Sequence, residues 1–151
     1  MPAIELTPAE RKEMGTAAIY KQLQGEAVKV LTGPEGDKAL LAQAEASATK
    51  DKAGLAAEET AAVSGGRGPD LIRVAEKAMG YGDNPKAIDL FQKGLAKPNP
   101  DAAAADYARL HLGIAQFNAG KKADAQATWG TIKTDGSAVQ FAKHWTLVSK
   151  S

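Results

Sequence analysis

One pattern of small, turn-forming and bulky residues occurs twice, in VAEKAMGYGDNPKAIDLF (residues 74–91) and in LGIAQFNAGKKADAQATW (residues 112–129). Four positions match in a single register, each 38 residues apart: Ala75, Gly82, Ala87 and Phe91 correspond to Gly113, Gly120, Ala125 and Trp129. Four matches in one register predict a structural unit that occurs twice.

The spacing within each unit predicts a pair of antiparallel helices. A small residue in the first helix (Ala75 or Gly113) precedes a small residue in the second by twelve positions, so we expect the two to face each other and let the helices approach closely. One turn later a large ring fills the space beside that contact. Gly82 and Gly120 are expected to take the left-handed conformation that ends a helix.

Composition favours an all-α fold. Of 151 residues, 5% are aromatic and alanine is abundant, which suits helices better than sheets. Nineteen basic and 18 acidic side chains leave a formal charge of +1, so no global field would attract nucleic acid. The chain has no cysteine, which excludes disulfides and thiolate metal sites. We expect no cofactor.

The N-terminal region, residues 1–64, is expected to be helical, and a degenerate hairpin is one arrangement it could take. A capping box at Thr7 to Glu10 predicts a helix to about Gln24. Residues 27–31 could be a helical turn or a strand, and residues 33–36 a turn. Asp37 can cap a helix that contains Leu40, and a separate helix is expected over residues 55–63. The glycine-rich run at residues 64–69 predicts the internal boundary.

The C-terminal region, residues 70–151, is expected to form two hairpins and a capping helix in one continuous globule. A second capping box, Ser137 to Gln140, opens the last helix, which places Phe141, Trp145 and Val148 at helical spacing. Repeat arrays need such a helix because the last hairpin otherwise exposes its apolar face.

The repeated unit resembles the tetratricopeptide repeat (TPR), whose pattern is Leu-Gly, Ala-x3-Phe and then Pro. Val74-Ala75 and Leu112-Gly113 stand at the first step, Ala87 with Phe91 and Ala125 with Trp129 at the second, and Pro98 at the third. The departures are Leu71 and Arg109 in place of Trp, Gln116 in place of Tyr, Ile132 in place of a small residue, and a period four residues too long. The chain is also similar in style to small bacterial TPR proteins, many of them exported.

The resemblance implies a groove that binds a protein or peptide, lined by the first helix of each unit. Its positions fall on Ile72, Glu76, Met79, Tyr107, Leu110, Ile114 and Phe117. Tyr107 is the expected exposed anchor. Leu110, Ile114 and Phe117 could instead contact the N-terminal helices or the capping helix. The subclass that clamps a C-terminal carboxylate is disfavoured, because Ile72, Glu76 and His111 stand where that subclass has cationic or amide side chains.

The expected role is therefore a non-catalytic scaffold or adaptor, with a self-associating structural protein, such as a symmetric homodimer, as the alternative. No apolar run is long enough to span a membrane, and no signal peptide is evident. If a signal peptide has been removed, the resemblance implies the periplasm; otherwise the cytoplasm is expected.

Enzyme chemistry has few candidate residues. His111 and His144 lie 33 positions apart, which is not a metal-ligand spacing, and they are the only candidates for the alternative of a small enzyme. There is no Gly-x-Ser-x-Gly elbow and no phosphate-binding Gly-Lys-Ser/Thr loop. We expect no catalytic residue and no metal site.

Overall fold

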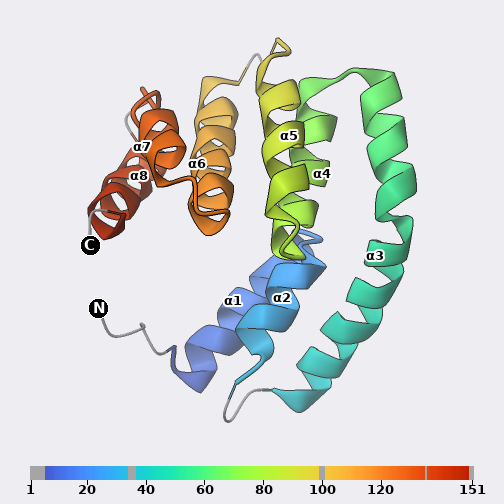
Figure 1. Cartoon of the computed structure of the whole chain (residues 1–151). Coiled ribbons are helices and arrows are strands. Elements are labelled where there is room, and N and C mark those ends of the chain that lie inside the picture. Colours follow the sequence, from blue (N-terminus) through green and yellow to red (C-terminus); the bar gives the residue numbers. More distant parts are fainter. Residues whose placement is uncertain (1–5, 34–36, 99–100, 135, 150–151) are drawn as a thin grey trace. The chain divides into compact units, whose positions relative to one another are not determined.

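The computed structural model describes residues 6–33, 37–98, 101–134 and 136–149, and these residues form eight helices and no strand. The all-α prediction is confirmed (Figure 1). In chain order the helices are α1 (Pro8–Tyr20), α2 (Gln24–Leu31), α3 (Lys38–Gly65), α4 (Gly68–Gly80), α5 (Asn84–Leu95), α6 (Ala102–Asn118), α7 (Lys122–Trp129) and α8 (Ser137–Val148).

The chain divides into two compact units, residues 1–56 and 57–151, and each is described by itself. The division falls inside α3, whereas the sequence suggested a boundary at residues 64–69. The glycine-rich run there ends α3, with Gly66 at a φ of +65°. The two helices expected between residues 37 and 63 are one helix of 28 residues. Gly54 does not interrupt it, because a single glycine among alanines costs only about 1 kcal/mol.

The first unit begins with the predicted capping box. The Thr7 amide donates to Oε2 of Glu10 (2.8 Å), and the Glu10 amide donates to Oγ1 of Thr7 (3.3 Å). Helix α1 ends at Tyr20 rather than near Gln24, and residues 27–31 are helical. Asp37 caps α3 as expected, since its Oδ1 accepts from the Leu40 amide (3.0 Å). Most of the turn expected at residues 33–36 lies outside the described residues.

The second unit contains the two predicted hairpins, α4–α5 and α6–α7, whose connecting turns are alike. The Gly82 amide donates to the Met79 carbonyl (2.9 Å) and the Asp83 amide to the Ala78 carbonyl (2.9 Å). At the second turn Gly120 and Lys121 donate to Phe117 (3.0 Å) and Gln116 (2.8 Å) in the same manner. Gly82 and Gly120 have φ values of +84° and +79°, so the prediction that they end their helices is confirmed.

Hairpin α1–α2 has the same turn, and the sequence did not reveal it. The Gln22 amide donates to the Ile19 carbonyl (3.0 Å) and the Leu23 amide to the Ala18 carbonyl (2.9 Å), with Gln22 at a φ of 60°. Sixty positions before Ala75, Ala87 and Phe91 stand Gly15, Ala27 and Leu31, all of them buried. The helix bounds shift by the same 60 positions, since Tyr20 corresponds to Gly80 and Gln24 to Asn84.

Packing inside two of the hairpins places the bulky residue of the second helix directly on the small residue of the first. A Cβ atom on Gly15 would lie 2.5 Å from Cδ2 of Leu31. One on Gly113 would overlap the Trp129 indole, lying 2.5 Å from its Cδ1. Close packing at Gly113 was predicted from the sequence, but Ala125 was expected to face Gly113, with the Trp129 ring beside that contact. Here the ring itself occupies the space that a side chain at position 113 would need.

Candidate functional site

Helix α8 closes the second unit by contacting both α6 and α7. This is the packing expected of the capping helix. The capping box predicted for α8 does not form: the N-cap is Gly136, with no side-chain hydrogen bond to the helix start. Ser137 lies within the helix, and its Oγ bonds instead to the Tyr107 hydroxyl of α6. The Ser137 hydroxyl, which the predicted capping box would have used, therefore forms a contact between α6 and α8 instead.

Asp106 of α6 holds the loop that joins α7 to α8. Its side chain is buried, and Oδ2 accepts hydrogen bonds from the Lys133 amide (3.1 Å), the Thr134 amide (2.8 Å) and the Thr134 hydroxyl (2.8 Å). Oδ1 pairs with Arg109. Burial by itself would raise the pKa of the Asp106 carboxyl, but the hydrogen bonds from Thr134, Lys133 and Arg109 hold that pKa below its ordinary value.

The other end of the α7–α8 pair is fixed by side chains. Nε2 of Gln126 donates to the Ser149 hydroxyl (2.8 Å), which itself donates to the Thr146 carbonyl (2.8 Å). Ser149 is buried although it is polar, so this contact is part of the core. Both ends of the α7–α8 pair are therefore anchored.

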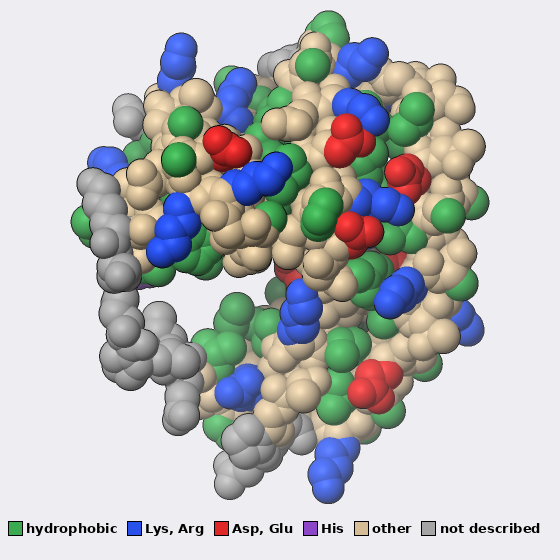
Figure 2. All heavy atoms as spheres, viewed as in Figure 1, with side chains coloured by type: hydrophobic (Ala, Val, Ile, Leu, Met, Phe, Trp, Pro, Cys, Tyr) green, Lys and Arg blue, Asp and Glu red, His purple; other side chains and the backbone are tan. Residues whose placement is uncertain are grey.

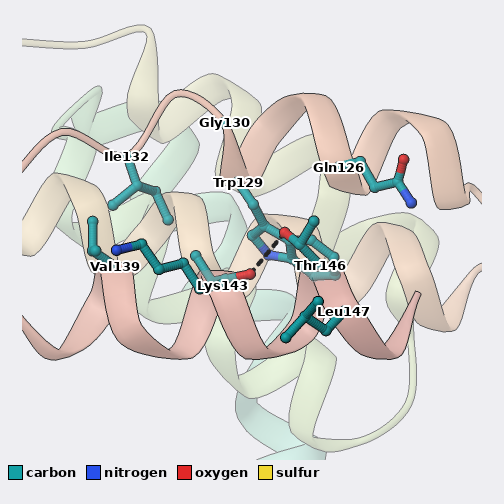
Figure 3. A pocket seen from close by; sticks show the side chains of 9 residues that line it. Gln126, Trp129, Gly130, Ile132, Val139, Lys143, Thr146 and Leu147 are labelled. Carbon is teal, nitrogen blue, oxygen red and sulfur yellow. Dashed lines mark hydrogen bonds between the residues drawn. The ribbon is translucent and has the colours of Figure 1, made fainter. Parts of the chain in front are cut away.

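Between these anchors lies an open pocket of about 540 Å³, which we call the α7–α8 groove (Figure 3). Its walls are mainly apolar. They are formed by Gln126, Trp129, Gly130, Ile132, Val139, Ala142, Lys143, Thr146 and Leu147. Figure 3 shows the Trp129 side chain between the two helices. Leu147 is 69% exposed, and an exposed leucine beside an apolar hollow is typical of a binding surface.

Trp129 is the best-fixed side chain of this groove. Its Nε1 donates to the Leu110 carbonyl of α6 (3.2 Å), and its ring lies on Gly113. Phe117 and Trp145 complete a group of three rings, with centroids 5.6 to 6.4 Å apart. The indole is therefore held by a hydrogen bond, a glycine and two neighbouring rings, so the wall it forms is rigid.

One lysine belongs to the groove, and three more lie on the segments that form it. Lys143 is part of its wall, and the nearby segments carry Lys121, Lys122 and Lys133. Residues 119–149 hold four lysines and two aspartates, whereas residues 57–118 hold seven basic and eight acidic side chains. Figure 2 shows basic side chains predominating on the visible surface around α6 to α8. The positive charge of the second unit is thus concentrated at its C-terminal end.

The seven residues predicted to line a groove lie elsewhere. Met79 is 9% exposed, and the Glu76 carboxylate is engaged by Nδ1 of His111 (3.0 Å). Ile72 is half-buried near Gly94 of α5. These three side chains of α4 therefore take part in packing within the second unit.

The four predicted positions on α6 are also used internally to different degrees. Leu110 is 4% exposed and belongs to a buried cluster with Trp129 and Ala142, and Ile114 and Phe117 pack against that cluster, so these three contact the terminal helices. Tyr107 is 40% exposed, as its expected role requires, but its hydroxyl is bonded to Ser137. None of the seven residues is among those that line the α7–α8 groove.

The sequence did contain a signal for the α7–α8 groove. Val139, Ala142, Lys143, Thr146 and Leu147 follow the helical spacing i, i+3, i+4, i+7 and i+8, which places them on one face of α8. The prediction for this helix rested on Phe141, Trp145 and Val148 instead, and Phe141 is 54% exposed. Which face of α8 would meet α7 depends on Asp106 and the loop it binds, and no local pattern specifies that contact.

Among the described residues, no group of three or more His, Cys, Asp or Glu side chains could hold a metal ion. No helix within the same ranges has the length and apolar character needed to cross a bilayer. No protein-family model matches the chain, and no curated protein and no solved structure is significantly similar to it.

Proposed function

We propose that this protein is a non-catalytic interaction module of TPR-like hairpins and that it binds a protein or peptide segment in the α7–α8 groove. The observation that carries the proposal is the groove itself. It is open, about 540 Å³ in volume and mainly apolar, which is the form of a surface that buries another chain's side chains. Its rigid Trp129 wall favours binding, because little side-chain freedom would be lost.

The TPR-like assignment is supported by the packing order of the second unit. Helix α5 contacts both α4 and α6, and α6 contacts α7, as expected when each second helix lies between two successive first helices. Helix α8 contacts α6 and α7 and so takes the place of a further first helix. The three matched turns extend the pattern to α1–α2. The departure is α3, a single 28-residue helix where a regular array would continue with a hairpin.

An affinity capture with variants tests the proposal. Wild-type protein, Leu147→Glu and Tyr107→Ala would be used as baits, with Lys29→Glu of α2 as a matched surface control. We expect partners to be retained by the Tyr107 and Lys29 variants and lost by Leu147→Glu, because a carboxylate would be buried against an apolar wall. Identical partners for all four baits would contradict the proposal.

A further inference from the structure

We propose that the α7–α8 groove takes an acidic amphipathic segment of a partner protein, with apolar side chains on one face and carboxylates beside them. This inference rests on the proposed function and adds the chemical class of the partner. It follows from two features of the same site, an apolar hollow and the lysines on the segments that form it.

The apolar part of the ligand is indicated by the walls. Trp129, Ile132, Val139 and Leu147 present rings and branched side chains, with Gln126 and Thr146 as the uncharged polar lining groups. Gln126 already donates to Ser149, and Thr146 already donates to the Ala142 carbonyl (2.8 Å). Those polar groups are engaged within the fold, so affinity would come mainly from burying apolar side chains of the partner.

The acidic part of the ligand is indicated by charge. None of Lys121, Lys122, Lys133 and Lys143 forms an ion pair with another described residue. Elsewhere in the second unit several cations are paired: Glu58 accepts from Arg73 (2.9 Å) and Lys77 (2.9 Å), and Glu59 from Lys86 (2.9 Å). Lys122 lies over the Phe117 ring, 5.9 Å from its centroid, and Lys143 stands in the groove wall. A lysine without an ion-pair partner in an apolar wall favours a ligand that supplies carboxylates.

A second copy of this chain fits the groove less well. In a symmetric dimer both copies use the same surface, so two groove surfaces that each carry Lys143 would face each other across an apolar contact. Like charges placed together at an interface oppose association. The same charges attract an acidic segment, which is why we choose a partner protein as the occupant.

The two tryptophans provide a reporter for the test, since the chain has no others, Trp129 lines the groove and the Trp145 ring lies beside it (6.1 Å between centroids). The probes would be two synthetic amphipathic peptides with the same leucine face, one with glutamates and the other with lysines on its remaining face. Each would be titrated into the full chain while tryptophan emission is recorded. We expect the glutamate peptide to change the emission saturably and to bind more weakly as salt is added.

Variants distinguish the contribution of the lysine charge to peptide binding from that of the apolar wall. Lys143→Glu should weaken binding of the glutamate peptide by about tenfold, with Lys143→Gln intermediate and Lys29→Glu without effect. Circular dichroism of each variant checks that it is folded. Leu147→Glu should abolish the response to the peptide, because it alters the apolar wall.

Other results would overturn the inference and leave the proposed function to the capture experiment. Equal binding of both peptides, with no effect of Lys143→Glu, would show an apolar site without charge selection. Preference for the lysine peptide, or no response to either, would also exclude an acidic segment. A molar mass that doubles with protein concentration in light scattering, accompanied by a change in emission, would identify a second copy as the occupant.

Discussion

Gly113 is a residue whose replacement tests the hairpin packing directly. We expect Gly113→Ala to lower the free energy of unfolding by about 1–3 kcal/mol, because the added methyl would overlap the Trp129 indole and force it to move. Urea unfolding followed by circular dichroism, which reports on the helices of both units, would measure the change. Gly54→Ala is the matched control, since nothing lies within 4 Å of a Cβ there, and it should raise stability by about 0.5–1 kcal/mol. Similar losses in both variants would contradict the packing described for α6 and α7.

Because of Asp106, we expect the free energy of unfolding to depend on pH in a specific way. Its pKa is lowered in the folded state, so its contribution is fully present above the pKa of the unfolded chain, near 4, and is lost as pH falls through the folded value. Asp106→Asn should cost about 1.5–3 kcal/mol at neutral pH, because four donors lose a charged acceptor.

The difference between wild type and Asp106→Asn should therefore shrink in acid. Urea unfolding at a series of pH values would measure it. Asp89→Asn serves as the comparison, because Asp89 is an exposed partner of Lys93 one turn away and should contribute at most about 0.5 kcal/mol. A difference at position 106 that stays constant below pH 4 would show that the carboxylate charge is not what stabilises the loop.

At the scale of single elements, substitutions in two of the hairpin turns should change stability in opposite directions. Gln22 has a φ of 60° without being glycine, so Gln22→Gly should stabilise the first unit by about 1 kcal/mol. Gly82→Ala should destabilise the second unit by about 1–2 kcal/mol, because its φ is +84°. Thermal unfolding followed by circular dichroism would measure both. If Gln22→Gly were destabilising, the turn of α1–α2 would not match the other two.

The same turns show how far the sequence predicts the fold. Hairpins α4–α5 and α6–α7 were predictable because glycine and a large ring recur in one register. Hairpin α1–α2 was missed because Gln22 stands where glycine was sought and Leu31 where a ring was sought, although backbone and burial are the same. The prediction of two helices between residues 37 and 63 was wrong, because the alanine-rich α3 stays helical through the single glycine Gly54.

The candidate site was less predictable than the fold. The sequence indicated apolar residues on α6, and Leu110, Ile114 and Phe117 are indeed grouped, but they pack against α7 and α8. The groove arises between α7 and α8, and its position depends on Asp106 binding a loop 27 and 28 residues further along the chain. Such long-range contacts determine which apolar face remains open, and periodicity alone does not contain them.

At the scale of the whole molecule, the division within α3 can be tested by breaking that helix. Gly54→Pro should reduce helical circular dichroism, because proline removes a backbone donor and clashes with the preceding turn, at a cost of about 3 kcal/mol. Tryptophan emission should stay as in the wild type, since Trp129 and Trp145 belong to the unit formed by residues 57–151. Gly54→Ala is the control for the position. Emission shifted towards that of unfolded protein would show that this unit depends on an uninterrupted α3.

The helix ends that flank the turns of α4–α5 and α6–α7 are displaced by the same number of positions, which makes it possible to lengthen this protein by whole modules. Gly80 and Asn118 end the first helices and Asn84 and Lys122 begin the second ones, both 38 positions apart. Duplicating residues 84–121 would thus add a module, with Lys121 joined to Asn84 in the place that Asp83 takes in the first turn, and would leave α6, α7 and α8 together. Lengthened variants could then carry one unchanged terminal groove, with the added modules as spacers behind a common binding end.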